Sequence, residues 1–304
     1  MSQPDTTQSL HSRLYKEDGT PRSIGVIGQP INHSLSPSFQ DVAFEYHNLP
    51  HRYQKWEVGT AELAAFIQKV REEGFLGLNL TVPHKQAVLA LADIVSEEAA
   101  GAGSVNTLFY HEGQLAGHTT DVAGFMEALK AEDYDPQKQR TLVLGAGGAA
   151  RAVVYALATA GATEIAVANR SFERSAELAE VMAAQFPQCN IYGTDLDPAA
   201  WPFNRNPRTL IVNATSQALT SPHEPFPVSA EALAGRNPER RTLFYDISYG
   251  NTPFLEMARA AEARTLDGLT MLVFQGAHSF ELWTGLTAPR QQMLEAAQAA
   301  LASK

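Results

Sequence analysis

The sequence contains little cysteine and no long hydrophobic run, and both absences exclude classes of protein. Its 304 residues include a single cysteine, Cys189, so no disulfide can form within the chain and a reducing compartment is expected. No cluster of His and Cys at metal-ligand spacing accompanies Cys189, so no metal site is expected. No apolar run reaches the roughly 18 residues of a membrane span, and the N-terminal residues are too polar for a signal peptide. We therefore expect a cytoplasmic protein without a membrane partner.

Basic residues are outnumbered by acidic ones, 23 against 33, which gives a formal net charge of -10. This balance argues against nucleic acid or an anionic membrane surface as a partner, because both require a basic face. Small anionic ligands remain compatible with it, since screening limits the reach of surface charge to roughly 8 Å. Lys85, Arg151 and Arg170 can therefore set the local potential of a pocket. We expect small-molecule partners only, for a monomer or a homodimer.

A glycine-rich turn within residues 141–151 joins an apolar strand to a helix pattern. Gly145 and Gly147 permit a tight turn and the close approach of a pyrophosphate, and Ala150 takes the third position of G-x-G-x-x-G/A. A second strand pattern over 164–168 completes a βαβ unit, which favours a dinucleotide site over a purely structural turn. The turn residues expected to contact the cofactor are Gly145, Ala146, Gly147, Gly148 and Ala149.

The residues that follow the second strand distinguish NAD from NADP. NAD sites carry an Asp or Glu about 20 residues after the glycines, whereas an Arg accommodates the 2′-phosphate of NADP. This chain has Asn169, Arg170 and Ser171 there, with Arg174 one turn later. Both guanidinium groups can pair with a phosphate, so NADP is predicted. The alternative is that Arg170 and Arg174 are solvated residues at the start of a helix.

Alternating strand and helix patterns predict an α/β protein with two domains. We expect a substrate domain over 1–120 with 268–304, and a doubly wound Rossmann domain over 121–267. The C-terminal helices are expected to pack back on the N-terminal domain. Besides the two strands of the βαβ unit, strands are expected over 23–28, 52–58, 77–82, 105–110, 114–118, 210–214 and 242–247, and helices over 39–47, 60–73, 85–92, 122–132 and 253–264.

Four polar clusters are candidates for binding the substrate. In residues 32–37, two serine hydroxyls two positions apart could both donate to a carboxylate. In residues 79–85, a strand end presents an asparagine, a threonine and an ammonium group on one side. Asn106 is the third candidate, and the pair Thr120 and Asp121 is the fourth.

Each candidate also has an ordinary structural interpretation. Ser34 and Ser36 could be helix-capping hydroxyls, and Asp121 could cap the helix that follows it. Lys85 alone would be typical of a solvated lysine at a helix start. Its place beside Asn79 and Thr81 favours a role in binding.

These segments, in this order, resemble the shikimate dehydrogenase family from residue 23 to residue 285. Several motifs carry the resemblance together, which makes it specific. They are GQPINHSLSP over 28–37, GLNLTVPHK over 77–85, SVNT over 104–107, NRS over 169–171 with Arg174, and DGL, MLV and QGA within 267–277.

The resemblance implies an NADP-dependent oxidoreductase that reversibly reduces 3-dehydroshikimate to shikimate in the aromatic amino-acid route. It implies a shikimate-binding domain over 1–120 with 268–304 and an NADP-binding domain over 121–267. Hydride transfer to or from the nicotinamide requires a group that moves a proton, and Lys85 is the candidate, with Asp121 orienting it. The implied substrate contacts are Ser34, Ser36, Thr81 and Tyr249 at the carboxylate, and Lys85, Asn106, Asp121 and Gln275 at the ring hydroxyls. Further implied cofactor contacts are Asn169, Arg170, Ser171, Arg174, Thr215, Ile247 and Gly268.

Four positions depart from the family pattern: Gln40, Thr119, Ala218 and Thr270. Ala218 and Thr270 stand where the family has glycine, near the expected nicotinamide end. If either place requires a positive φ or a close backbone approach, the replacement adds strain or crowding.

Two alternatives remain open. A quinate/shikimate dehydrogenase using NAD or NADP would share the chemistry, and the presence of both Ser34 and Ser36 favours shikimate over quinate. A non-catalytic NADP-binding regulator belongs to a different class. The presence of Lys85 and Asp121 argues against it.

Overall fold

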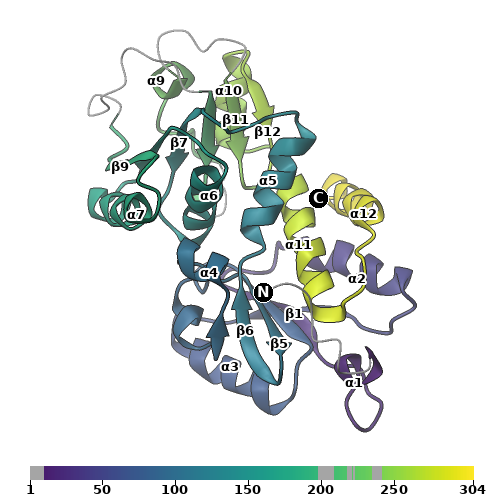
Figure 1. Ribbon diagram of the computed structural model, residues 1–304. Coiled ribbons are helices and arrows are strands. Elements are labelled where there is room, and N and C mark those ends of the chain that lie inside the picture. Colours follow the sequence, from purple (N-terminus) through teal and green to yellow (C-terminus); the bar gives the residue numbers. More distant parts are fainter. Residues whose placement is uncertain (1–9, 198–208, 218–220, 222, 235–241) are drawn as a thin grey trace. The chain divides into compact units, whose positions relative to one another are not determined.

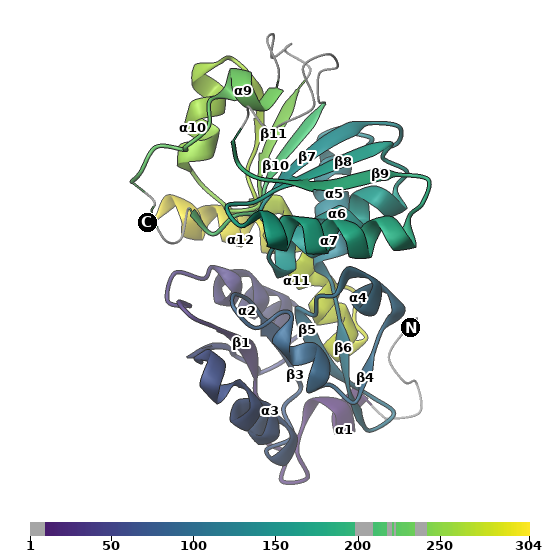
Figure 2. The same ribbon diagram turned by 90° about the vertical axis from the view of Figure 1, so that its left-hand side faces the viewer.

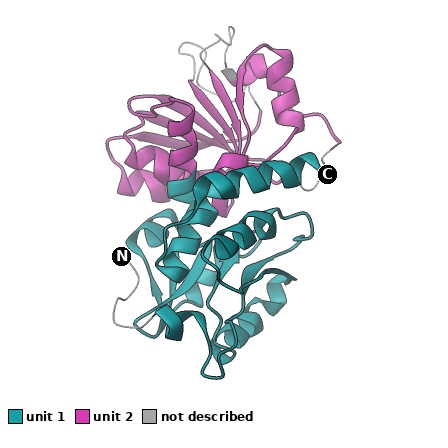
Figure 3. Cartoon of the chain, turned by 90° about the vertical axis from the view of Figure 1, so that its right-hand side faces the viewer, with its two compact units in different colours: residues 1–124, 272–304 teal, residues 125–271 magenta. Residues whose placement is uncertain are grey.

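The computed structural model describes residues 10–197, 209–217, 221, 223–234 and 242–304. The chain divides into two compact units (Figure 3), residues 1–124 with 272–304 and residues 125–271. Each unit contains a six-stranded sheet with helices, so the predicted α/β class is confirmed. In the described ranges, no helix combines the length and the apolar character needed to cross a bilayer.

The sheet of unit 1 has the strand order β2-β1-β3-β5-β6-β4. β1 runs parallel to β2 and β3, whereas β5 runs antiparallel to both β3 and β6. The strands predicted over 105–110 and 114–118 are therefore found, as the antiparallel pair β5 and β6. The strands are β1 (Ile24–Gly28), β2 (Tyr53–Glu57), β3 (Gly77–Leu80), β4 (Ile94–Val95), β5 (Thr107–His111) and β6 (Gln114–His118).

The helices of unit 1 pack through apolar positions spaced three and four residues apart. On α3, Leu63, Ile67 and Val70 are buried in the core against Leu78 and Leu108 of the sheet. α12 packs against α2 (Figure 1), so the expected return of the C-terminal helices to the N-terminal part is confirmed. The helices are α1 (Leu10–Leu14), α2 (Ser36–Tyr46), η1 (Thr60–Glu62), α3 (Leu63–Glu72), η2 (Ala87–Ala90), α4 (Glu97–Ala102) and α12 (Arg290–Ala302), with the first residues of α5 (Asp121–Ala131) and most of α11 (Leu269–Thr284).

Unit 2 is a doubly wound parallel sheet with the order β12-β11-β10-β7-β8-β9, fanned out in Figure 2. If the strands β7 to β12 are numbered 1 to 6 along the chain and read from the β9 edge, the order is 3-2-1-4-5-6. This is the strand order of dinucleotide-binding folds, which confirms the Rossmann prediction. The order reverses between β7 and β10, where such folds bind their ligand. The strands are β7 (Arg140–Leu144), β8 (Glu164–Ala168), β9 (Asn190–Thr194), β10 (Leu210–Asn213), β11 (Leu243–Asp246) and β12 (Arg264–Leu266), and the helices are α6 (Gly148–Thr159), α7 (Phe172–Gln185), α9 (Ala230–Ala234) and α10 (Pro253–Ala260).

Two helix predictions were too long. The helix expected over 85–92 is only the short 3-10 helix η2, because the Lys85 carbonyl accepts a hydrogen bond from Val105 N–H at 2.8 Å instead of continuing a helix. The helix expected over 253–264 ends at Ala260. Glu262 then takes a positive φ of 57°, and the chain enters the edge strand β12, which the sequence did not predict.

Candidate active site

A buried ion pair joins the two residues predicted to be catalytic. Lys85 Nζ lies 2.6 Å from Asp121 Oδ2, and the two side chains are 14% and 4% exposed. Lys85 lies on the loop after β3, and Asp121 is the first residue of α5. Charges buried to this degree require a partner and further hydrogen bonds to offset their lost hydration. Removing either one would leave the other buried and uncompensated.

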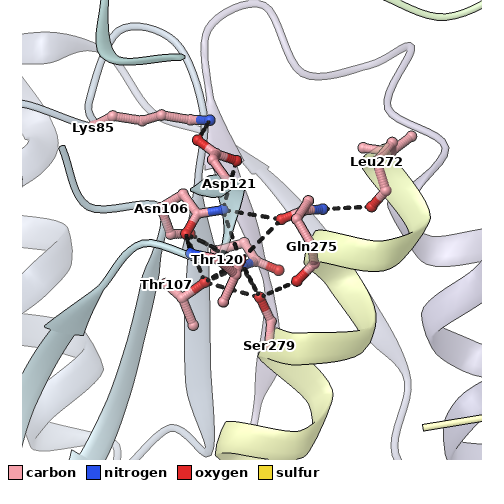
Figure 4. A network of polar contacts seen from close by, with 9 residues as sticks. Lys85, Asn106, Thr107, Thr120, Asp121, Leu272, Gln275 and Ser279 are labelled. Atoms are coloured by element: carbon pink, nitrogen blue, oxygen red, sulfur yellow. Dashed lines mark hydrogen bonds and ion pairs between the residues drawn. The ribbon is translucent and has the colours of Figure 1, made fainter. Parts of the chain in front are cut away.

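Asn106 supplies the further hydrogen bonds (Figure 4). Its Nδ2 lies 2.8 Å from Asp121 Oδ1, 2.9 Å from Thr120 Oγ1 and 3.0 Å from Gln275 Oε1. The amide has two hydrogens, so these three acceptors share two donors. The Asn106 Oδ1 accepts from Thr120 N–H at 2.8 Å, which fixes the orientation of the carboxamide. Lys85, Asn106, Asp121 and Gln275 are therefore brought together as one cluster.

A layer of buried hydroxyls lies beneath this cluster, in which the sequence named Thr120 as a candidate but not Thr107 or Ser279. Ser279 Oγ lies 2.8 Å from Thr107 Oγ1 and 3.1 Å from Thr120 Oγ1, and it donates to the Gln275 carbonyl at 3.0 Å. Asn79 Nδ2 reaches Ser279 Oγ, Thr107 Oγ1 and the carbonyl of Asn106, each at 3.0 Å. The network thus joins β3, β5 and α11 beneath the ion pair.

Tyr53 ends this network on the side of β2. Its hydroxyl donates to Asn79 Oδ1 at 2.6 Å. Burial raises the pKa of Tyr53 well above its usual range, so the hydroxyl keeps its proton and remains a donor. The Asn79 carboxamide is therefore held in one orientation, with its amide nitrogen Nδ2 toward Ser279.

Ser34 and Ser36 form a second polar group at the start of α2. Their hydroxyl oxygens lie 3.2 Å apart, and Ser34 Oγ also accepts from Ser36 N–H at 3.2 Å. The N-cap of α2 is Leu35, without a side-chain cap, but Ser34 Oγ accepts an N–H of the first helical turn, so the helix-capping alternative stays open for Ser34. Two hydroxyls so placed can each donate to one oxygen of a carboxylate.

Two ammonium groups that sequence reasoning missed hold the loop before these serines. Lys55 Nζ donates to the carbonyl of Asn32 and Lys304 Nζ to that of His33, each at 2.6 Å. The two ammonium groups thus bond to consecutive carbonyls of one loop, and burial, together with the charge of Lys55, lowers the pKa of Lys304. They add positive charge beside the serine pair in a chain of net charge -10.

The remaining substrate candidates lie in different parts of the chain. Thr81 directly follows β3, and its N–H donates to Ile27 O at 3.0 Å. Gly28 leaves room for it, because a Cβ at Gly28 would meet the Thr81 methyl group. Tyr249 belongs to unit 2, between β11 and α10.

The structure describes three of the four positions that depart from the family pattern. Gln40 is buried and donates to Gly276 O at 2.9 Å, which ties α2 to α11. The Thr119 hydroxyl is buried, with no hydrogen-bond partner among the described residues. Thr270 lies in the first turn of α11 without a positive φ, so the strain considered for it does not arise. Ala218 lies outside the described residues.

The glycine turn of unit 2 has the geometry of a pyrophosphate cradle. Gly145 has φ +108°, and a Cβ there would lie 2.7 Å from the carbonyl oxygen of Ala214 after β10. Gly147 is the N-cap of α6, without a side-chain cap, and a Cβ on it would enter open space. The start of α6, at Gly148 and Ala149, is therefore not covered by a capping side chain, so an anion can approach it, and the turn fits the predicted dinucleotide. Ala146 is buried within the turn.

The segment after β8 begins α7. Ser171 is the N-cap, accepting from Arg174 N–H at 3.4 Å and donating to Glu173 at 2.7 Å, and Asn169 donates to Ser171 O at 3.0 Å. Arg170 and Arg174 are exposed, and within the described chain neither guanidinium has an ion-pair or hydrogen-bond partner. Both remain available to a phosphate.

The last three cofactor candidates follow the ends of β10, β11 and β12. Thr215 Oγ1 donates to Asn213 Oδ1 at 2.7 Å after β10. Gly268 N–H donates to Ser248 O at 2.9 Å, and a Cβ on Gly268 would collide with the carbonyl of Ile247. The close approach of these two loops therefore requires glycine at 268.

Comparison with known proteins decides the family. Three family models match: the shikimate dehydrogenase substrate binding domain over residues 26–108, shikimate / quinate 5-dehydrogenase over 127–195, and the shikimate 5′-dehydrogenase C-terminal domain over 268–298. The shikimate dehydrogenase (NADP(+)) of Methanopyrus kandleri is 38% identical over 286 residues, which cover 92% of this chain and 96% of the relative. This chain belongs to the shikimate dehydrogenase family.

Solved structures of the shikimate dehydrogenase family share the fold. The shikimate 5-dehydrogenase of Thermus thermophilus, in complex with NADP(H) and shikimate, aligns with a TM-score of 0.78 and 38% identity over 92% of this chain and all of the other. The 5-ketofructose reductase of a Gluconobacter strain aligns with a TM-score of 0.76 and 32% identity, over 91% and 99% of the two chains. The shikimate dehydrogenase fold therefore also occurs with a different named substrate.

Proposed function

We propose that this protein reversibly reduces 3-dehydroshikimate to shikimate with NADPH, a step of aromatic amino-acid biosynthesis. The observation that carries the proposal is the buried ion pair of Lys85 and Asp121, 2.6 Å apart and held by Asn106 in a chain of this family. The partners are small molecules, and the protein acts in the cytoplasm as a monomer or a homodimer.

Lys85 is the proposed acid and base. Bound NADPH supplies the hydride, so the protein must supply a proton to the oxygen that becomes the hydroxyl. The ammonium of Lys85 donates this proton in the reduction direction, and the neutral amine accepts it in the oxidation direction. Asp121 holds the amine in place, and Asn106 fixes the second carboxylate oxygen at 2.8 Å. The two side chains flank the reacting hydroxyl.

The substrate carboxylate is proposed to bind at Ser34 and Ser36. The two hydroxyls, now hydrogen-bonded to each other at 3.2 Å, would each turn to one carboxylate oxygen. The ammonium groups of Lys55 and Lys304 strengthen the local attraction for an anion. Thr81 and Tyr249 support this end, and Asn106 and Gln275 bind ring hydroxyls beside Lys85 and Asp121.

NADP is proposed to bind unit 2. The glycine turn over 145–149 receives the pyrophosphate at the start of α6. Arg170 and Arg174 pair with the 2′-phosphate. Asn169 and Ser171, in the same segment, are also proposed to contact the cofactor. The other proposed contacts are Thr215, Ile247 and Gly268.

A steady-state comparison of four substrate and cofactor pairs tests this function. Shikimate and quinate are each oxidised with NADP and with NAD, and kcat/KM is measured from the absorbance of the reduced cofactor. We expect shikimate with NADP to be preferred. The end of the pocket lined by the Ser34 and Ser36 hydroxyls suits shikimate, because its carboxylate-bearing carbon lacks the extra hydroxyl of quinate. A preference for quinate would contradict the proposed substrate and favour the quinate/shikimate dehydrogenase. Oxidation of neither substrate with either cofactor would contradict the proposed reaction.

A pair of glycine substitutions separates folding from cofactor binding. We expect Gly145→Ala to lower the free energy of unfolding by about 1–3 kcal/mol, because the new Cβ adds strain at φ +108° and meets Ala214 O. Gly147→Ala should cost less than about 1 kcal/mol, since its Cβ meets nothing within 4 Å.

The Gly147→Ala protein, although stable, should bind the cofactor less tightly. Gly147→Ala should raise the Kd for NADP by about tenfold, or roughly 1.4 kcal/mol, because the methyl group occupies the space meant for the pyrophosphate. Thermal unfolding and a fluorescence titration with NADP measure the two effects. A Gly147→Ala protein with normal NADP affinity would contradict the placement of the pyrophosphate.

A further inference from the structure

Two helices of unit 1 carry opposite ends of the proposed substrate site. Ser36, at the carboxylate end, is the first residue of α2, and Gln275, at the ring-hydroxyl end, lies on α11. The carboxylate and the hydroxyls of shikimate are attached to one six-membered ring, so the distance between them is nearly fixed. One shikimate molecule can therefore reach both ends only if α2 and α11 are held at a matching distance.

Gln40 makes a hydrogen bond that joins these two helices. Its Nε2 donates to Gly276 O at 2.9 Å, and its side chain is fully buried. Gln40 lies four residues after Ser36, so the two side chains share one face of α2. At the other end of the bond, Gly276 directly follows Gln275. The bond therefore connects the helical turn after Ser36 with the residue next to Gln275.

The packing around α11 leaves no spare room at the same level. A Cβ on Gly276 would lie 2.5 Å from Phe39 Cε2 and 3.0 Å from Gln40 Nε2, both on α2. A Cβ on Gly124 of α5 would lie 2.7 Å from the backbone nitrogen of Gln275. In a close-packed interior, contacts of this kind prevent α11 from moving toward either helix. Separation of α11 from α2 is opposed by the Gln40 hydrogen bond.

The bond to α11 also accounts for a polar side chain at this buried position. Within the described residues, Gln40 Oε1 is buried without a hydrogen-bond partner. A buried acceptor that is left unpaired costs free energy, and an apolar side chain of the same length would avoid this cost. The hydrogen bond donated by Nε2 is therefore what an amide provides here and an apolar side chain does not.

We propose that Gln40 is a positioning residue, which sets the distance between the carboxylate end and the ring-hydroxyl end of the substrate site. This inference rests on the proposed function, which places Ser36 and Gln275 at those ends. Gln40 is fully buried and acts through the two helices. Without its hydrogen bond, α11 lies farther from α2, and a ring held at Gln275 no longer brings its carboxylate to Ser36.

Calorimetric titration of the full chain with shikimate, without cofactor so that no turnover occurs, tests this role. Gln40→Met keeps the length of the side chain and removes its donor. We expect the Kd for shikimate to rise about tenfold, the scale of one lost hydrogen bond. The Kd for NADP should keep its wild-type value, because NADP is proposed to bind unit 2. An unchanged Kd for shikimate would overturn the positioning role.

A double-mutant cycle with Ser36→Ala distinguishes positioning from general damage to unit 1. If Gln40 acts by placing Ser36, its effect requires the serine hydroxyl. Gln40→Met should then raise the Kd by less than about twofold when Ser36 is already alanine. General damage would instead add the full tenfold loss in both backgrounds, and that result would also overturn the proposal.

His47→Phe is the matched control, because it removes another contact between the same two helices. His47 Nε2 lies 2.9 Å from Thr287 O, which joins the segments that follow α2 and α11, and the ring stacks on Phe280. Phenylalanine keeps the stacking and loses the hydrogen bond. We expect wild-type affinity for shikimate, since this contact lies far along both helices from Ser36 and Gln275.

A second variant covers the case in which Gln40→Met does not fold. Gly276→Ala should separate the same helices through the contact of its methyl group with Phe39, and should weaken shikimate only while Ser36 is present. Wild-type protein that bound no shikimate would contradict the proposed function, and the role of Gln40 with it. Wild-type binding that both variants left unchanged would overturn the role of Gln40 alone.

Discussion

Replacing Lys85 with alanine should lower kcat for the reduction of 3-dehydroshikimate by about a hundredfold or more. The reason is the loss of the group that delivers the proton to the developing hydroxyl. Stopped-flow or steady-state measurement of NADPH consumption gives the value. The matched control is Lys69→Ala, which removes a lysine of α3 that is 48% exposed and should leave kcat unchanged.

The loss of Lys85 also leaves Asp121 buried without its partner, so folding must be followed separately from chemistry. Thermal unfolding and the Kd for NADPH serve this purpose, because NADP is proposed to bind unit 2. In the double variant Lys85→Ala with Asp121→Asn, we expect little further loss of kcat, since the two residues act as a unit. Turnover close to the wild-type value in Lys85→Ala would remove Lys85 from the mechanism.

The second large effect concerns cofactor choice. Replacing both Arg170 and Arg174 with glutamine should lower the preference for NADP over NAD, as a ratio of kcat/KM, by about a hundredfold or more. A hydrogen bond to a charged group contributes about 1.5–3 kcal/mol, and two such partners of the 2′-phosphate would be lost. Efficiency with NAD should change little, because NAD lacks that phosphate.

The control for this pair is Arg52→Gln, an arginine of unit 1 with a 63% exposed side chain that pairs with Glu45. It tests whether loss of any surface arginine alters cofactor use. An unchanged NADP preference in the double variant would mean that Arg170 and Arg174 are solvated residues at the start of α7, the alternative interpretation of that segment.

Local signals made the Rossmann unit predictable from the sequence. The glycine turn, the helix and the strand over 164–168 lie within about thirty residues, so one motif contains most of the information. The edge strand β12 could not be predicted in the same way. It has three residues, and only its pairing with β11 makes it a strand.

The candidate site was predictable only in part. Lys85, Asn106, Asp121 and Gln275 were named from motifs, and the structure brings them into one cluster. Ser279 was missed, because a serine inside an apolar helix pattern carries no signal by itself. Its importance comes from contacts with Asn79, 200 positions away in the chain, that exist only after folding.

The same limit explains the missed lysines. Lys55 on β2 and Lys304 after α12 are ordinary surface residues by sequence. They reach consecutive carbonyls of Asn32 and His33 because the fold brings two distant segments to one loop. Side chains that act through tertiary contacts of this kind have no fixed spacing in the sequence, so no motif predicts them.

The most direct test of the account is the initial rate of NADPH consumption by the purified protein with saturating 3-dehydroshikimate. The account predicts turnover in the common enzyme range of roughly 1–10³ s⁻¹, with shikimate as the product. Binding of NADPH without turnover would contradict it, and would identify the chain as a cofactor-binding regulator that retains the fold and the ion pair without the reaction.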